Sequence, residues 1–404
     1  MNSKNIDNLF LILFFLLPIS ILIGPSASLI NILIIDVFFL LLIFIKKDFS
    51  CFKNKAVQLL FIFYLYLIFN SLISVDKEVG LFRNLGFIRI VILFIAFNYF
   101  FKNSFFQNSV FKIWSIILSV VLFDVFIESF TGQNLLGYGN MYGRRIVSFF
   151  KDEAIIGGYI NCFYLILSGY LFTQFKDSNK NFALIFSIIF LIAILLTGER
   201  SNSIKALMGL IIFYLSLSHY DMKKKITVIN SLLIIIFLII FNSQYLKLRF
   251  VKQIEAHISK DSRERIYFKL YKSGLEVFKN HKLFGVGNKN YRVVTCEQKN
   301  FDIMNKENYS CNTHPHQIYF ELLSEHGLIG TFLIFFILYK LIFSKIRDVY
   351  IERNYIQIGS LIYIIFTFLP LLPSGAFFSD YMLTLFIINL SIFYSSSKKL
   401  NIFN

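Results

Sequence analysis

The chain has 404 residues and a formal net charge of +16; 56 % of its residues are hydrophobic and the mean hydropathy is +0.66. Its lysines and arginines cluster in every second short connection between apolar runs, which is the positive-inside pattern of membrane proteins and argues against a nucleic-acid partner. The apolar runs approach the roughly 20 residues that a helix needs to cross a bilayer core, and they show no two-residue alternation typical of barrel strands. Composition therefore predicts an all-α polytopic membrane protein.

About twelve membrane-spanning helices are predicted, surrounded by membrane lipids, with both ends of the chain in the cytoplasm. The chain then divides into residues 1–242 with nine spans, an outer loop region at 243–316, and residues 317–404 with three spans and a cytoplasmic tail. The first span resembles a signal peptide, but the spans that follow need it for their orientation, so we interpret it as uncleaved. The expected spans are 8–24, 27–45, 56–74, 81–101, 113–130, 154–175, 182–198, 201–218, 226–242, 317–343, 355–372 and 376–394.

Two loops on the outer side, 131–153 and 243–316, are long enough to carry structure. The second contains a helical run from Ser262 to His281, with lysines on its polar face. Such an amphipathic helix could lie along the membrane surface. Its apolar stripe follows helical spacing and comprises Ile266, Leu270, Gly274, Val277 and Phe278.

Two of the four cysteines share the larger outer loop. Cys296 and Cys311 lie fifteen residues apart there, whereas Cys51 is expected in the cytoplasm and Cys162 within a span. Disulfides persist in oxidising compartments outside the cytoplasm. We therefore predict a bridge between Cys296 and Cys311, which would hold the chain just before its next histidine, His314.

Two arginines on the outer side are candidate ligands for an anion. Arg200 lies in a short hairpin between two spans, and Arg265 opens the outer-loop helix. Positive charge is disfavoured on this side by topology, so another role is expected to retain it. A guanidinium matches the geometry of phosphate oxygens, and several of them at one outer pocket would suit a pyrophosphate.

Four further arginines lie near the membrane: Arg83, Arg89, Arg144 and Arg145. Of these, Arg89 and Arg145 are also candidates for substrate binding. For Arg83 and Arg145 the alternative is snorkelling of the side chain toward the interface. For Arg89 the alternative is an ion pair with Asp36 or Asp124, the carboxylates within other spans.

Three of the six histidines lie between Cys311 and Phe336, where polar chain becomes a membrane helix. His316 stands at the membrane edge, and imidazole is the usual general base near neutral pH. The simpler interpretation is interfacial hydrogen bonding. His314 and His316 alternate as metal ligands do, but no HExxH spacing occurs and His326 would point about 80° away from His316 on a helix. No metal is therefore expected.

Several of these motifs resemble those of a known family. His316-Gln317, followed by Gly327 and Gly330, resembles the signature of the O-antigen ligase family, a histidine and a small polar residue before a spaced Gly-x-x-Gly. The two glycines would let a neighbouring helix pack closely. "TGERS" around Arg200 and "RERIYFKLYKSGLEVFKNHKLFGVGNKNY" also resemble segments of this superfamily, so that the resemblance extends over roughly residues 80 to 390.

The resemblance implies a glycosyltransferase of the GT-C type in the bacterial inner membrane, acting on the periplasmic face. Its donor would be a glycan on undecaprenyl pyrophosphate and its acceptor a sugar hydroxyl of lipid A–core. By resemblance to the family, Arg200 and Arg265 would bind the pyrophosphate, and His316 would activate or orient the acceptor hydroxyl. The reaction would invert the configuration at the sugar and would need neither a metal nor a nucleotide cofactor. Glu199 departs from the family pattern and could restrain Arg200 by pairing. The remaining candidates for substrate binding are Gln317, His314, Gly327 and Gly330.

Three alternatives stay open. The polymerase of the same pathway would join lipid-linked repeats instead of using lipid A–core, and a protein oligosaccharyltransferase belongs to the same superfamily. A secondary transporter would fit the span number and the intramembrane charges Asp36, Arg89 and Asp124. Transporters of this kind have two matching halves, which this sequence lacks.

Overall fold

The computed structural model describes residues 3–139, 145–176, 179–259, 266–296, 309–370 and 372–403. Within these ranges the chain is helical and contains no strand. The helices of the bundle are α1 (Ser3–Ile23), α2 (Pro25–Lys46), α3 (Lys55–Leu72), α4 (Lys77–Leu85), α5 (Ile88–Phe101), α6 (Ser104–Thr131), α7 (Ile156–Gln174), α8 (Lys180–Leu196), α9 (Arg200–Ser216), α10 (Met222–Asn242), α15 (Ile318–Leu341), α17 (Tyr355–Thr367) and α18 (Asp380–Ser395). The shorter elements are α11 (Gln244–Lys247), the π-helical turn η4 (Leu248–Lys252), α12 (Gln253–Ser259), α13 (Ile266–Asn280), α14 (Tyr291–Cys296), α16 (Ile346–Glu352) and the 3₁₀ turns η1 (Ser50–Lys53), η2 (Ser148–Phe150) and η8 (Phe343–Lys345).

Each of the expected spans falls on helix, and the all-helical membrane class is confirmed. Eight segments of the described chain are long and apolar enough to cross a membrane, while α8, α17 and α18 are shorter apolar helices. The expected span 81–101 is not one regular α-helix, because between α4 and α5, at Gly86 and Phe87, the backbone changes to hydrogen bonds between residues three apart. The count of twelve spans remains a prediction.

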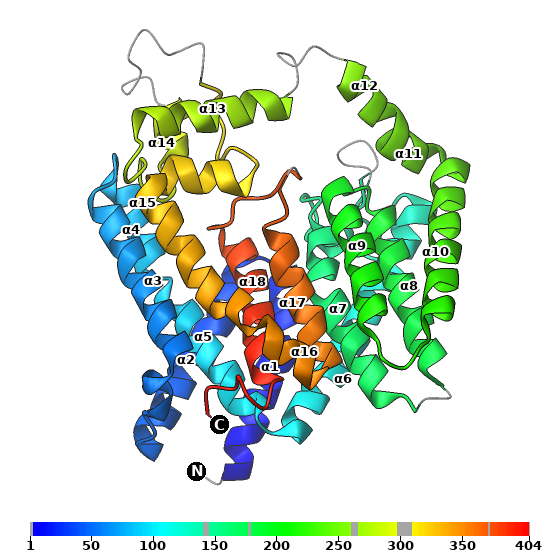
Figure 1. The fold of residues 1–404 in the computed structure, drawn as a ribbon, viewed down its shortest axis with the longest axis horizontal. Helices are drawn as coiled ribbons and strands as arrows, with labels where there is room; N and C mark the ends of the chain where they lie inside the picture. The colour runs from blue at the N-terminus through cyan, green and yellow to red at the C-terminus, as the bar shows by residue number, and fades with distance from the viewer. Residues whose placement is uncertain are drawn as a thin grey trace.

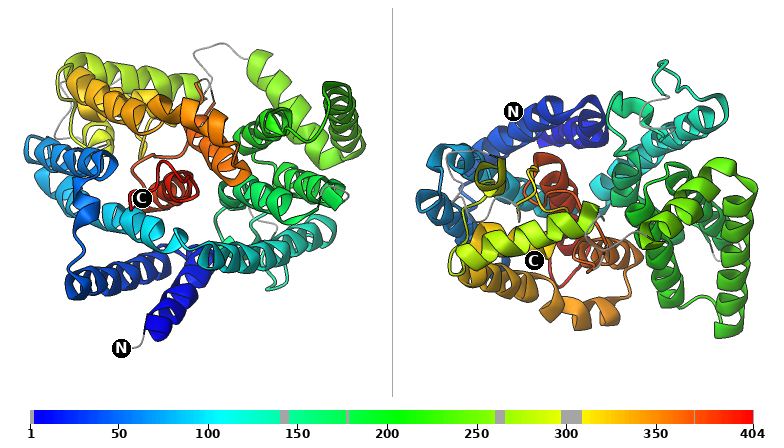
Figure 2. Two further views of the ribbon diagram at one scale, coloured as in Figure 1. Left: turned by 60° about the horizontal axis from the view of Figure 1, so that its bottom comes forward. Right: turned by 90° about the horizontal axis from the view of Figure 1, so that it is seen from above.

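The bundle is built around α7, α17 and α18. α17 packs against α7 and α18, and α18 packs against α5 (Figures 1 and 2). The apolar window of α7 is 83 % buried, whereas that of α10 is only 17 % buried, so α10 is peripheral and α7 central. The two ends of the chain lie at one end of the bundle, opposite α13 and α14 (Figure 1). That opposite end is called the outer end below.

The outer-loop region packs onto the bundle through α13 (Figure 2). Leu270, Gly274 and Val277 of the predicted apolar stripe are buried, and a Cβ on Gly274 would lie 3.0 Å from Pro315. This part of the stripe therefore faces the start of α15, and the position of the helix along the membrane surface stays a prediction. A small core beneath α13 consists of Val277, Val286, Tyr291 and Val294, with Tyr309 against it.

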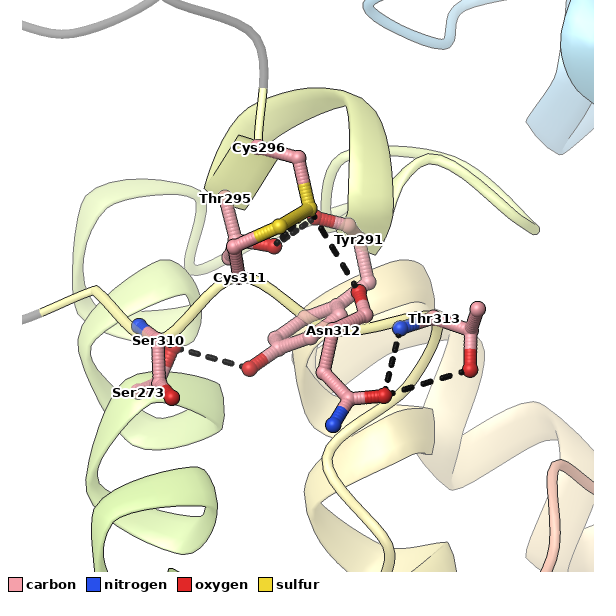
Figure 3. Close-up of a disulfide and its surroundings, with 8 residues drawn as sticks. All are labelled: Ser273, Tyr291, Thr295, Cys296, Ser310, Cys311, Asn312 and Thr313. Atoms are coloured by element: carbon pink, nitrogen blue, oxygen red, sulfur yellow. Dashed lines mark hydrogen bonds between the residues drawn. A yellow bond between two sulfur atoms is a disulfide. The ribbon is translucent and has the colours of Figure 1, made fainter.

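A disulfide joins α14 to the chain that leads into α15 (Figure 3). It pairs Cys296 with Cys311, with their Cα atoms 4.6 Å apart, which is the pairing expected from the sequence. The neighbouring polar atoms hold the same segment, because the Ser273 hydroxyl accepts hydrogen bonds from Tyr291 Oη (2.8 Å) and from the Ser310 N–H (3.0 Å). The chain is therefore anchored five residues before His316.

α15 is interrupted at Gly327, which has φ +63° and ψ −166°. The break frees backbone groups that would be costly to leave unpaired inside a bundle. The loop of residues 282–287 satisfies them: the Val286 N–H donates to Ser324 O (2.9 Å), and the Leu328 N–H donates to Lys282 O (2.8 Å). The interrupted helix and this loop thus form one hydrogen-bonded unit at the outer end.

Gly327→Ala is expected to destabilise the protein by at least about 1–3 kcal/mol, the cost of a non-glycine residue in a sparsely populated backbone region. The added Cβ would also lie 2.4 Å from Leu283 C. Thermal unfolding of purified protein in detergent measures the effect. Gly375→Ala is the matched control, because its Cβ would meet Met382 Cγ at an ordinary 3.5 Å. Equal melting temperatures for the two variants would contradict this account of the break.

Candidate functional site

A cavity of about 1030 Å³ lies among the outer ends of α7, α9, α17 and α18, beside α13. It combines residues that are far apart in the sequence. Arg145, Arg200 and Arg249 line it, and so does His316. Two of these, Arg200 and His316, are predicted catalytic residues, and Arg145 is a predicted substrate ligand. The cavity therefore unites the basic groups and the imidazole that the sequence singles out.

The guanidinium groups of Arg249 and Arg145 are held by neutral oxygens rather than by carboxylates. Arg249 Nη2 donates to Gly198 O (3.0 Å) and its Nη1 to Gln253 Oε1 (2.8 Å), while Arg145 Nη2 donates to Ala154 O (2.8 Å). Burial lowers the pKa of Arg249, and the positive charges of Arg145 and Arg200 lower it further. Since neutral oxygens orient these side chains, their charge remains available to an anionic ligand.

Glu199 does not neutralise Arg200. Its carboxylate accepts hydrogen bonds from the Gly157 N–H (2.7 Å) and from Asn202 Nδ2 (2.6 Å). Burial raises the pKa of Glu199, opposed by these hydrogen bonds and by the charge of Arg145. The carboxylate thus ties the start of α7 to the α8–α9 turn, and the expected restraint of Arg200 by pairing is not observed.

Arg89 pairs with Asp380 and not with Asp36 or Asp124. Arg89 Nη2 lies 2.5 Å from Asp380 Oδ1, and Arg83 Nη2 lies 3.3 Å from Asp380 Oδ2. Asp124 instead accepts from the Ser148 hydroxyl. Sequence reasoning had no way to choose Asp380, which lies some 290 residues further on, at the start of α18. Arg83 lines the cavity, and this ion pair forms part of its wall.

His314 and His316 have different tasks, although their rings are only 4.0 Å apart. A carbonyl oxygen can only accept, so His314 Nε2 carries the proton that it donates to Ser374 O (3.3 Å). Its Nδ1 then accepts from the Thr313 hydroxyl (3.0 Å). Burial, with the charge of His316 as the second cause, lowers the pKa of His314 to about 3. His314 is thus a neutral ring with both nitrogens occupied.

His316 faces the cavity from a turn with φ +56°, directly before the helix cap of α15. Its carbonyl accepts from the Ser374 N–H (2.9 Å), and the ring of Tyr267 lies 6.2 Å from its own. Burial lowers the pKa of His316 below its ordinary value near 6.5. The imidazole is therefore neutral at physiological pH, which is the state that a general base requires.

The remaining predicted site residues lie away from the cavity wall. Gln317 caps α15 by accepting from the Tyr319 N–H (2.7 Å) and the Phe320 N–H (3.1 Å). Gly330 faces the Tyr66 hydroxyl of α3, and Gly327 faces the loop before α14. Their roles in substrate binding stay predictions, and Arg265 lies outside the described residues.

Glu321 is a buried carboxylate of α15 that secures the segment beside the histidines. Its Oε2 accepts from the Phe377 N–H (2.9 Å), three residues after Ser374. Glu321→Ala would leave that N–H unpaired and loosen Ser374, which bonds to both His314 and His316.

We expect Glu321→Ala to lower the turnover rate about tenfold with an unchanged KM for the donor, since the loss acts through the position of His316. Glu321→Gln should restore the rate, because its amide oxygen can accept the same bond. Steady-state kinetics of both variants measure this. Equal losses in the two variants would show that the charge of Glu321, and not its hydrogen bond, is what matters.

Two basic residues of the cavity wall were not predicted from the sequence: Arg249 on η4 and Lys205 on α9. Arg249 follows the span expected at 226–242, so it lies on the same disfavoured outer side as Arg200. Positive charge on the disfavoured side could have singled out Arg249, but Lys247 and Lys252 lie close to it in sequence, so the segment resembles a solvated basic cluster.

Comparison with known families adds the decisive observation. Residues 185–335 match the O-antigen ligase family. The match runs from α8 through the outer-loop region into α15, and it includes Arg200, Arg249 and His316. The resemblance predicted from the sequence is confirmed over this region. No curated protein matches the chain.

An O-antigen ligase domain within an array of apolar helices indicates a bacterial membrane enzyme of the ligase and polymerase type, acting on lipid-linked sugars. No group of three or more His, Cys, Asp or Glu side chains within the described ranges is placed to share a metal ion.

Proposed function

We propose that this protein is an O-antigen ligase, which transfers a glycan from undecaprenyl pyrophosphate to a sugar hydroxyl of lipid A–core on the periplasmic face of the inner membrane. The observation that supports this is the single cavity lined by Arg145, Arg200, Arg249 and His316. An imidazole beside guanidinium groups that form no ion pair with any described carboxylate suits a reaction in which an acceptor loses a proton and a phosphate departs.

The proposed reaction is one displacement. The acceptor hydroxyl oxygen attacks the anomeric carbon of the glycan, and the bond between that carbon and the pyrophosphate oxygen breaks with inversion. His316 takes the hydroxyl proton, and the bonding electrons leave with undecaprenyl pyrophosphate. Arg200 and Arg249 stabilise the negative charge that grows on the leaving phosphate. Arg265, which opens the outer helix in sequence, is proposed to join them.

Two features of the wall fit an anionic donor. Asp380 is paired with Arg83 and Arg89, and Glu199 is bonded to Gly157 and Asn202. Neither carboxylate therefore competes for the guanidinium groups of the other three arginines that line the cavity. Because the site lies at the outer end of a membrane bundle, a lipid-linked donor can present its pyrophosphate there while its chain stays in the bilayer.

Reconstitution tests the proposal. Purified protein in nanodiscs, supplied with a glycan on undecaprenyl pyrophosphate and with lipid A–core, is expected to produce glycosylated lipid A–core, detected by mass spectrometry. Longer glycan on undecaprenyl pyrophosphate, without any transfer to lipid A–core, would identify a polymerase instead. Absence of both products would contradict a glycosyltransferase.

A further inference from the structure

Lys205 is a charged group of the cavity that has no part in the proposed displacement. Lys205 lies on α9, is 9 % exposed, and lines the cavity together with Asn161 of α7 and Tyr363 of α17. No residue in the described part of the chain accepts a hydrogen bond from its ammonium or forms an ion pair with it. An ammonium group in this position is costly unless something pairs with it.

Lys225 shows how this fold treats a buried lysine that is structural. It is 6 % exposed, lies at the other end of the bundle near the start of α10, and donates to Leu215 O (2.8 Å). Lys205 is buried to a similar degree but has no such acceptor. Burial alone therefore does not explain why its ammonium is left unpaired.

The carboxylates of the cavity wall are not available to Lys205. Among the residues that the structure describes, three line it: Glu153, Glu199 and Asp380. Glu199 and Asp380 already have the partners given above, and Glu153 is exposed. No described carboxylate of the wall therefore pairs with Lys205, and its ammonium is left to contact an anion bound in the cavity.

Helix geometry places Lys205 inward of the arginines. It follows Arg200 by five residues, so its Cα lies about 7.5 Å deeper along α9 at 1.5 Å per residue. Side chains on a helix lean toward its N-terminus, so the long lysine side chain extends back toward the level of Arg200. Lys205 therefore lines the same cavity as Arg200 from a deeper level of α9, about 140° further around the helix.

We propose that Lys205 forms an inner anion subsite that binds a phosphate group of the donor, with the amide of Asn161 as a second donor beside it. The identity of the donor rests on the proposed function. Lys205 contacts the phosphate that is bonded to the lipid chain, while Arg200 and Arg249 contact the phosphate that leaves the sugar. Two phosphates are thereby held at two levels of one cavity.

Binding of undecaprenyl pyrophosphate to the full chain in nanodiscs tests the subsite. Lys205→Met keeps the length of the side chain and removes the charge, and it is expected to weaken binding at least tenfold. Lys225→Met is the matched control for loss of a buried lysine, and it should bind as the wild type does. Lys205→Met should leave the melting temperature of the ligand-free protein unchanged or higher, since it removes an unpaired charge.

Inorganic pyrophosphate separates the two possible sources of the phosphate. If Lys205→Met loses affinity for inorganic pyrophosphate and for undecaprenyl pyrophosphate equally, the subsite recognises phosphate alone. If the loss is confined to undecaprenyl pyrophosphate, the subsite also needs the lipid. Both results support the subsite.

Wild-type affinity of Lys205→Met, in an assay where Arg249→Ala has lost binding, would overturn the subsite and leave the proposed function intact. Failure of the wild-type protein to bind undecaprenyl pyrophosphate would overturn both.

Discussion

His316→Ala is expected to lower glycan transfer by about 10²–10⁴-fold, the usual contribution of a positioned general base. Donor affinity should stay near that of the wild type, because the guanidinium groups that line the cavity are unaffected. His281→Ala is the matched control, since His281 lies on the same outer region and does not line the cavity. Transfer by His316→Ala at the wild-type rate would remove His316 from the mechanism.

The rate of transfer is expected to fall at acidic pH. The base must be neutral, and burial lowers the pKa of His316 below its ordinary value near 6.5. The kcat/KM of the wild type should therefore be flat above pH 6.5 and fall only as the pH drops through that lowered pKa. His314, with a pKa of about 3, titrates too low to produce this limb. An acid limb that persists in His316→Ala would assign the titration to another group.

Arg249→Ala is expected to lower kcat/KM for the donor by about 10²–10³-fold, the typical loss when one preorganised donor to a developing anion is removed. Arg249 faces Arg145 and Arg200, which are near enough to lower its pKa, so its removal reduces the positive field at the centre of the site. Arg249→Lys should recover only part of the loss, because an ammonium cannot reproduce the fork that reaches both Gly198 and Gln253.

Arg292→Ala provides the control for a general loss of positive charge on the outer side. Arg292 is exposed on α14 and does not line the cavity. Initial rates at varied donor concentration distinguish the variants. Equal losses for Arg249→Ala and Arg292→Ala would indicate long-range attraction of the donor instead of a binding contact.

The positions of the membrane helices could be predicted because apolar length and basic loops are local signals. Interruptions within them could not. At Gly86 and Phe87 the backbone changes to bonds between residues three apart within the same segment, whereas the break at Gly327 depends on partners from elsewhere in the chain. At Gly327 the partners are backbone groups of residues 282–287, which satisfy the interrupted α15. No sequence pattern within α15 predicts that residues 282–287 bond to it.

The chemistry of the site was predictable by residue type but not by pairing. Arg200 and His316 stood out because positive charge and imidazole are unusual at the outer membrane edge. Which histidine remains available depends on Ser374, a residue some 60 positions further on that occupies His314. In the same way, Glu199 next to Arg200 in sequence bonds to Gly157 instead.

A cryo-EM structure of the protein with undecaprenyl pyrophosphate tests the central claim most directly. Phosphate density is expected inside the cavity, in contact with Arg200 and Arg249 and on the side of the cavity that His316 faces. Well-ordered pyrophosphate bound elsewhere, with these side chains in their present arrangement, would contradict it.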